Sequence, residues 1–447
     1  MWAAAGQTLA MTIRIGGGQG FYGDGHGPVA DLLADGIDFL VCEALAELTL
    51  AILAKDRLRD ESLGWTRDLP RYVGAALPHL MSGRTRMITN AGGINPIAAG
   101  RAVVDLLRAN GVTGLRVATI VGDDIRSHGD ALELSDDTVF AHAYLGAAPV
   151  VAALDAGAHI VVGGRIADAS LFLAPLIHSY GWSWDDWDRL AAGVTAGHLL
   201  ECSGQVTGGN YSGDWWVNDD PTKVGFPIGE VEPDGTFVLT KPRGTGGRVT
   251  FDTVREQLLY EVHDPAAYLN PDVTADLSAV RLVDLGGDRV RVEGARGGPP
   301  PATYKGLVCT PDGWSSEARF AYGWPDAAAK ARAAMRFVRT RAEAASIEVL
   351  EWHEELFGLN AFGGPTVPTA ADEPPEVMGR LAWRCATSAQ AAAVSADGGL
   401  LGLSGPPMIA SADRARGGKP SQVLRLRAVA VDRALVDAGV RIDVTEV

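Results

Sequence analysis

The sequence predicts an α/β protein: a parallel sheet with helices on both faces, followed by a mostly antiparallel α+β region. Short apolar segments alternate with helical patterns over about the first 180 residues, which is typical of a parallel sheet. Those segments are continuously apolar, as expected of strands that are covered on both faces. From about Gly225, turn signals such as Pro233-Asp234-Gly235 separate alternating segments instead. We therefore predict two parts, residues 11–224 and residues 225–447.

Each predicted element has its own local signal. Asn95 is a natural N-cap and Pro96 a natural first helical residue, while Gly36, Gly111 and Gly157 each end a helical pattern. The expected strands of the first part are Thr12–Ile15, Ile37–Cys42, Arg86–Thr89, Leu115–Val121 and His159–Val162. Its expected helices are Pro28–Ala34, Leu45–Arg57, Ile97–Ala109, Ala143–Ala156 and one after Asp168. In the second part we expect helices over 325–345 and 378–396, and strands around a short helix over 421–447.

Composition excludes some classes of function. The net charge of −16 argues against nucleic acid or an anionic membrane as the main partner, since both select for basic patches. The four cysteines are scattered without a C-x-x-C spacing, which indicates neither a disulfide framework nor a structural zinc site. We therefore expect a cytoplasmic protein that binds a small molecule.

Glycine-rich segments follow the predicted parallel strands. Ligands bind beyond the carboxyl ends of the strands in such sheets, and glycine lets the backbone approach them closely. The segments after the first and third strands supply the candidate substrate-binding residues Gly18, Gly20, Asp24, Asn90, Gly92, Gly93 and Asn95.

A dinucleotide-binding fingerprint is an alternative interpretation of the first of these segments. Residues Gly18–Gly23 spell G-x-G-x-x-G, and Glu43 stands twenty residues beyond the last glycine. A helix should open at that glycine, but Asp24–Pro28 intervene, so the context of the motif is wrong. We do not predict a nicotinamide cofactor.

Two further loops carry charged candidates. Asp123 and Asp124 directly follow a strand, where they can bind a hard cation or act as a base, or merely cap a helix and face solvent. Arg165 follows Gly163-Gly164 near a helix N-terminus, and its guanidinium can clamp a carboxylate or phosphate. Asp168 would orient Arg165 or act as the base, and the alternative is a purely structural pair. We expect Arg165 to be partly exposed and to contribute little to stability.

Two more segments complete the candidate site. Residues 197–202 supply His198 and Glu201 as catalytic candidates, and a helix there places His198 and Cys202 on one face as a base and a thiol nucleophile. Buried packing is the alternative role for Cys202. Residues 241–248 combine three cations with glycine, so Lys241 is a candidate for binding an anionic substrate group, with a surface hairpin as the alternative.

These motifs together resemble the acyclic terpene utilization AtuA family, over nearly the whole chain from Met11. The resemblance is carried by the following segments: Arg14-Ile15-Gly16, Gly20-Phe21, Gly23-Asp24, Asp38–Glu43, Thr89–Pro96, Gly122-Asp123-Asp124, Gly163–Asp168, Gly197–Cys202, Thr207-Gly208-Gly209, Thr240-Lys241-Pro242, Gly246-Gly247, Glu256–Glu261 and Asn270–Val273.

The resemblance implies a setting in the breakdown of branched acyclic terpenes, whose intermediates are acyl-CoA esters. We expect an enzyme that acts on a branched acyl-CoA thioester or a related carboxylate, by hydration, dehydration or carbon–carbon lysis. The alternatives are a non-catalytic subunit that completes a partner's active site, and a metal-dependent hydrolase built on Asp24, Asp123 and Asp124. No definite cofactor is predicted, and a divalent metal stays open.

Two expectations concern partners. The tryptophan-rich segment Trp182–Trp216 and the alanine-rich helix over 325–345 predict self-association as a dimer, because large apolar surfaces are usually buried against something. A small ferredoxin-fold subunit is a second partner that the resemblance alone implies.

Overall fold

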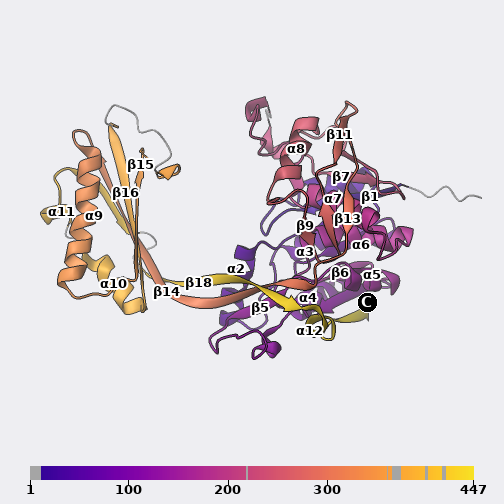
Figure 1. Cartoon of the computed structure of the whole chain (residues 1–447), viewed down its shortest axis with the longest axis horizontal. Coiled ribbons are helices and arrows are strands. Elements are labelled where there is room, and N and C mark those ends of the chain that lie inside the picture. The colour runs from indigo at the N-terminus through magenta and orange to yellow at the C-terminus, as the bar shows by residue number, and fades with distance from the viewer. Residues whose placement is uncertain (1–11, 218–219, 360, 365–373, 398–400, 415–418) are drawn as a thin grey trace, which may run out of the picture. The chain divides into compact units, whose positions relative to one another are not determined.

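The computed structural model describes residues 12–217, 220–359, 361–364, 374–397, 401–414 and 419–447 (Figure 1). It divides into two compact units: unit 1 comprises residues up to 308 together with 426–447, and unit 2 comprises residues 309–425. The chain enters unit 2 within strand β14 (Thr303–Gly323) and returns within β18 (Ser421–Asp432). The expected boundary near residue 224 stays a prediction, and strands from both sides of it share the main sheet of unit 1.

Unit 1 is built on a ten-stranded sheet. Its centre consists of parallel strands in the order β1-β2-β3-β6-β4, which confirms the predicted parallel pairing. Antiparallel strands extend this centre on both sides, so the sheet is mixed. In order across the sheet the strands are β11 (Arg281–Asp284), β12 (Val290–Glu293), β8 (Phe237–Thr240), β7 (Ile228–Val231), β1 (Ile13–Gln19), β2 (Phe39–Cys42), β3 (Arg86–Thr89), β6 (Ile160–Val162), β4 (Arg116–Val121) and β19 (Arg441–Glu446).

Helices cover both faces of the parallel centre, as predicted. Successive side chains of a strand point to opposite faces, so Leu40 joins one hydrophobic cluster and Val41 the other. The first cluster contains the helices α1 (Pro28–Ala34), α3 (Leu69–Met81) and α4 (Pro96–Ala109). The second contains α5 (Ala148–Asp155), α6 (Asp168–Tyr180) and α7 (Trp187–Leu200).

A small sheet packs against α7. Val273 and Ala275 of its central strand join the same cluster as Leu190 of α7. The contact is close, because a Cβ on Gly297 would lie 2.0 Å from the Trp187 carbonyl oxygen. The three strands are β13 (Arg296–Gly298), β10 (Val273–Asp276) and β9 (Tyr268–Asn270). The remaining elements of unit 1 are α2 (Glu47–Arg59), β5 (Phe140–Ala143), which pairs with β14, α8 (Phe251–Leu259) and α12 (Arg433–Asp437).

Apart from the short helix α11 (Leu401–Ser404), the elements of unit 2 from β14 to β17 follow the order strand–helix–strand–strand–helix–strand, which is the order of ferredoxin-like folds. Its antiparallel strands lie in the order β15-β16-β14-β17, and Met335, Leu381 and Val394 form the core between this sheet and two helices. The elements besides β14 are α9 (Ala327–Ala344), β15 (Glu351–Phe357), β16 (Glu376–Cys385), α10 (Ser388–Asp397), the short α11 (Leu401–Ser404) and β17 (Ile409–Arg414).

Three predicted elements differ from the structure. The helix predicted over Ala143–Ala156 begins only at Ala148, since Phe140–Ala143 form β5. The first strand continues through Gly16, Gly17 and Gly18 to Gln19, whereas the prediction ended it at Ile15. The prediction of one helix over 378–396 was wrong, since β16 occupies residues 376–385 and α10 begins only at Ser388. Every second side chain of β16 is buried, and α9 packs on the face that these side chains form.

The expectations about a dimer and about a small ferredoxin-fold subunit stay predictions. Trp215 and Trp216 are 65% and 64% exposed, so apolar surface is available for contact, but the dimer stays a prediction. Among the described residues, no helix combines the length and the apolar character that crossing a bilayer requires.

Candidate active site

The loops after the parallel strands meet at one edge of the main sheet, as the sequence predicts. The loop after β3 bonds to the loop after β6, where the Gly92 amide donates to the Gly163 carbonyl oxygen at 3.0 Å. It also bonds to the loop after β2, since the Ala44 amide donates to Asn90 Oδ1 at 2.8 Å. Asp123, after β4, accepts from the Arg165 amide at 2.7 Å. These hydrogen bonds hold the loops after β2, β3, β4 and β6 next to one another.

The glycines at this edge contact protein. A Cβ on Gly17 would lie 2.3 Å from the Leu200 carbonyl oxygen, and one on Gly20 would lie 2.8 Å from the Cys202 carbonyl carbon. The missing side chain of Gly18 would face Leu40 at 2.4 Å. Glycine therefore lets β1 approach the end of α7 closely, which brings residues 201–203 beside the strand.

Close packing also explains the next pair of glycines. A Cβ on Gly92 would lie 2.4 Å from the Gly163 carbonyl oxygen, and Gly93 has a φ of +56° with Leu53 at 2.4 Å from its Cβ position. Asn95 caps α4 by accepting from the Ala98 amide at 3.3 Å, which confirms the predicted helix start. The predicted roles of these residues in substrate binding stay predictions.

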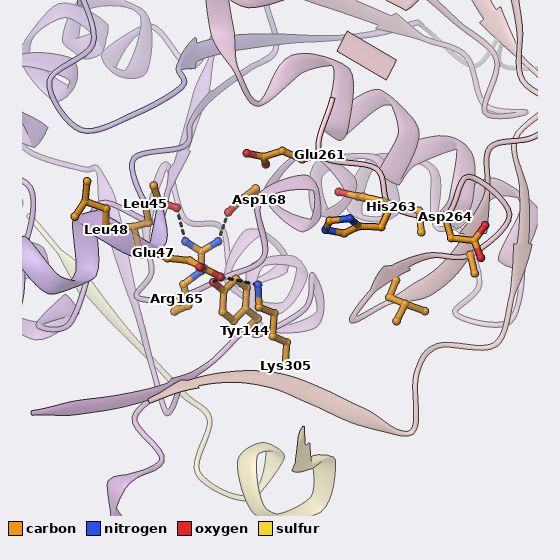
Figure 2. A pocket seen from close by; sticks show the side chains of 14 residues that line it. Leu45, Glu47, Leu48, Tyr144, Arg165, Asp168, Glu261, His263, Asp264 and Lys305 are labelled. Carbon is orange, nitrogen blue, oxygen red and sulfur yellow. Dashed lines mark hydrogen bonds and ion pairs between the residues drawn. The ribbon is translucent and has the colours of Figure 1, made fainter. Parts of the chain in front are cut away.

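Three adjoining cavities of unit 1 all include Asp168 in their lining. The first, of about 950 Å³, extends from the start of α2 to β9 and is shown in Figure 2. The second, of about 500 Å³, reaches β18, and the third, of about 540 Å³, reaches the end of α7. Leu45 and Glu261 line the first and third cavities, and Tyr144 and Tyr268 line the first and second. Asp168 therefore stands where the three spaces join.

Arg165 lies beneath this junction and is only 1% exposed, which corrects the expectation of a partly exposed side chain. Its guanidinium donates to the Leu45 carbonyl oxygen and to Asp168 Oδ1 (Figure 2). Burial opposes the charge of this guanidinium, but Asp168 and Tyr144 outweigh it and raise the pKa of Arg165. Both terminal nitrogens thus already have protein partners, while binding of a substrate anion stays a prediction.

Tyr144 lies between two cations. The Arg165 guanidinium carbon is 4.2 Å from the centre of its ring and Lys305 Nζ is 4.7 Å from it, distances at which cation–π attraction operates. Glu47, the first residue of α2, accepts from Lys305 Nζ at 2.7 Å and from the Tyr144 hydroxyl at 3.3 Å. This arrangement fixes one wall of the first cavity (Figure 2).

Glu43 is a buried carboxyl group in the lining of the third cavity. It accepts from Asn90 Nδ2 at 2.9 Å and from the Leu45 amide at 2.6 Å. Burial and the nearby charge of Asp168 raise the pKa of Glu43 well above its ordinary value. The predicted residue Asn90 therefore positions a buried carboxyl group whose protonated form is favoured more than in an exposed glutamate.

His198 and Glu201 form a second buried pair, which the sequence predicts as catalytic residues. His198 Nδ1 lies 3.1 Å from Glu201 Oε1, and the His198 ring centre lies 5.2 Å from that of Tyr268. Burial raises the pKa of Glu201 to about 7, although the hydrogen bond from His198 lowers it. Burial opposes protonation of His198, but the bond and charge of Glu201 raise its pKa. The pair can hold and release a proton near neutral pH.

The contribution of Glu201 to the stability of the protein should fall as pH rises from about 4.5 to about 7. The ordinary pKa of Glu201 is 4.5 and its folded value is about 7, so the folded chain binds more protons than the unfolded chain in that interval. The raised pKa of His198 acts in the same direction. Chemical unfolding of the wild type and of Glu201→Gln across the interval measures this, and the slope should be smaller in the variant. An equal slope in both would contradict the assignment.

Cys202 follows α7 and lines the third cavity. Burial and the charge of Glu201 raise the pKa of its thiol, so the neutral thiol is favoured over the nucleophilic thiolate. The raised pKa therefore does not favour Cys202 as a thiol nucleophile.

The three aspartates of the metal alternative have separate partners. Asp24 accepts from the Ser203 hydroxyl at 2.7 Å, Asp123 lies 2.8 Å from His142 Nδ1, and Asp124 pairs with Arg126 at 2.6 Å. Among the described residues no three His, Cys, Asp or Glu side chains gather closely enough to hold a metal ion. Asp24 lines the third cavity, whereas Asp123 and Asp124 line none of the three.

Lys241 lies away from the three cavities and is buried. Its ammonium group donates to the Thr245 carbonyl oxygen at 2.8 Å and lies 3.2 Å from Asp288 Oδ2. These contacts fold residues 241–245 into a local turn.

The sequence analysis missed several residues of the junction. Glu43 could have been found, because it directly follows a buried strand of the parallel sheet. Glu261 ends a motif segment, Glu256–Glu261, but nothing in that motif marks it as a site residue. The others lie in segments with no motif of their own, and only the fold brings them to Asp168: they are Glu47, Tyr144, Tyr268 and Lys305.

Comparison with known proteins identifies a family. A family model described as acyclic terpene utilisation family protein AtuA matches residues 13–442 of the 447. No curated protein and no solved structure matches the chain significantly. The match includes every element that lines the three cavities, and it confirms the resemblance carried by the motifs. The chain belongs to the acyclic terpene utilisation family AtuA.

Proposed function

We propose that this chain is an enzyme that hydrates or dehydrates a branched acyl thioester by acid–base chemistry at Asp168 and Glu201. The observation that carries the proposal is the buried His198–Glu201 pair, whose carboxyl has a pKa of about 7 and lines the same cavity as Asp168. A pKa near the working pH is what an efficient general acid or base requires.

The chemical step uses two carboxyl groups in opposite roles. In the dehydration direction, Asp168 removes a proton from the α-carbon of a 3-hydroxyacyl thioester, and the protonated Glu201 gives its proton to the departing β-hydroxyl. A Cα–H bond and a Cβ–O bond break, a C=C bond forms, and water leaves. Hydration is the reverse. After the product leaves, Asp168 gives the α-proton to solvent through its 37% exposed side chain, and Glu201 takes up a proton from water in the third cavity. His198, 3.1 Å from Glu201, holds that carboxyl group in position.

The charges around the junction favour a thioester over a free carboxylate. Asp168, Glu201 and Glu261 all line the third cavity, and the buried Arg165 is already paired with Asp168. A free carboxylate would enter an acidic space without an unpaired cation, which is costly. A thioester carbonyl is neutral and avoids that cost.

The test is a turnover assay in deuterated water with the purified full chain. Branched 2-enoyl-CoA and 3-hydroxyacyl-CoA esters are the substrates, and NMR detects deuterium at the α-carbon together with the hydrated or dehydrated product. We expect both signals at catalytic enzyme concentration. Neither would appear if the chain is a non-catalytic subunit, and activity that requires a second protein would support that alternative. Fragments with fewer carbons would indicate carbon–carbon lysis.

A further inference from the structure

The second cavity differs in character from the other two. About half of its lining residues are aliphatic or proline and Asp168 is its one carboxylate, whereas several carboxyl groups line each of the first and third. The remaining members are Asp168 at the junction, three tyrosines and three other polar residues: Tyr144, Tyr268, Tyr304, Asn270, Thr303 and Lys305. The apolar members, which we call the apolar arm, are Ala167, Ala169, Leu269, Pro271, Pro301, Ala428, Val429 and Ala430.

The apolar arm is continuous with the junction at Asp168. Tyr144, Tyr268, Leu269 and Lys305 line both the second cavity and the first. Ala167 and Ala169 flank Asp168 in the sequence and line the arm with it. A molecule whose reacting carbons lie at Asp168 can thus extend in one direction toward Glu201 and in the other into the arm.

Exposed leucines in the arm and in the adjoining first cavity point to an apolar ligand. Leu269, on β9, and Leu48, on α2, are each 68% exposed although they line the first cavity. Exposed leucines are ordinary when isolated, but two that line one cavity offer apolar surface that a hydrocarbon would cover. Covering such surface is favourable in proportion to its area.

We propose that the apolar arm binds the branched hydrocarbon tail of the substrate and sets its preferred chain length. Four of its members are alanines, whose small side chains leave width for a methyl branch. This inference rests on the proposed acyl thioester reaction, because that reaction fixes the reacting carbons at Asp168.

The experiment places a charge or bulk in the arm. Leu269→Glu introduces a carboxylate at an exposed position, so its effect on folding should be small. Ala430→Trp fills the arm from β18, where the residue is exposed. The matched controls are Leu285→Glu and Val444→Trp, because Leu285 and Val444 are 48% and 42% exposed and line none of the three cavities. Calorimetry measures Kd for saturated CoA thioesters of four to ten carbons, and kcat/KM is measured for the matching enoyl esters.

If the apolar arm binds the tail, the affinity of the wild type should increase with tail length. Both arm variants should lower the ratio of long-chain to short-chain affinity by about tenfold or more. The controls should leave this ratio unchanged. Length-dependent binding that the arm variants abolish would support the arm even if no ester were turned over, and only the proposed reaction would then fail. Turnover with a length preference that neither arm variant changes would overturn the arm and leave the reaction standing.

Discussion

Replacement of Glu201 by glutamine should lower kcat about a thousandfold, because removal of a general acid or base costs about a hundredfold to ten-thousandfold. Glutamine has the shape of the carboxylic acid form, which is the form that burial favours below pH 7. The variant should therefore fold and bind substrate nearly as the wild type does. Stopped-flow or steady-state turnover of the preferred enoyl ester gives kcat, and calorimetry gives the affinity.

Glu256→Gln is the matched control for that variant. Glu256 lies on α8, and its carboxylate accepts from the exposed Ser212 amide at 3.1 Å rather than lining one of the three cavities. Its kcat should stay within about twofold of the wild-type value, since surface substitutions away from a site have small effects. A Glu201→Gln variant with unchanged kcat and unchanged pH profile would remove Glu201 from the mechanism.

Truncation of Arg165 to alanine should destabilise the protein by about 2–4 kcal/mol as well as abolish activity. The side chain is 1% exposed, so its loss leaves a cavity, an unpaired Leu45 carbonyl oxygen and an uncompensated Asp168. The 37% exposure of the Asp168 side chain moderates this cost, because water can solvate the carboxylate that is left. Chemical denaturation with far-UV circular dichroism gives the free energy of unfolding.

Two comparison variants make this result interpretable. Arg126→Ala removes an arginine whose side chain is 43% exposed in its pair with Asp124, and it should change stability by less than about 1 kcal/mol. Arg165→Lys keeps a cation but cannot reach Leu45 and Asp168 with a rigid fork, so it should recover only part of the stability. If Arg165→Ala kept wild-type stability and lost only substrate affinity, the arginine would be a ligand for a substrate anion after all.

The arrangement of the first part of the chain could be predicted because each element has a local cause. The strand Arg86–Thr89 has the bounds that the sequence predicts, and Asn95 caps the helix after it. The prediction ended the first strand before Gly16–Gly18, because glycine normally weakens a strand. Gly17 is needed there for the close approach of Leu200 at the end of α7, which is distant in the sequence. Residues 378–385 were predicted as part of a helix. Their alternation of buried and exposed side chains identifies a strand only once α9 is known to pack on one face of β16.

The candidate site could be predicted only in part. His198 and Glu201 are three residues apart, so a local helix brings them together and the sequence is sufficient. Arg165 was expected at the right edge of the sheet, but its burial depends on Leu45 and Tyr144, which lie elsewhere in the chain. The contact between Glu47 and Lys305 joins residues 258 positions apart. A motif based on residue spacing cannot identify a contact between residues so far apart in the sequence.

Unit 1 is assembled from two stretches of chain that are separated by all of unit 2. The later stretch supplies Ala428–Ala430 to the apolar arm and β19 to the edge of the main sheet, where the Val447 amide donates to the Leu115 carbonyl oxygen at 2.9 Å. During synthesis on the ribosome, the loops of the candidate site therefore emerge long before the wall that completes their cavity. A single protease cut within residues 309–425 would likewise leave unit 1 as two polypeptides joined only by non-covalent contacts. If activity survives the cut, the non-covalent contacts, including the pairing of β19 with β4, are sufficient to hold the two polypeptides together.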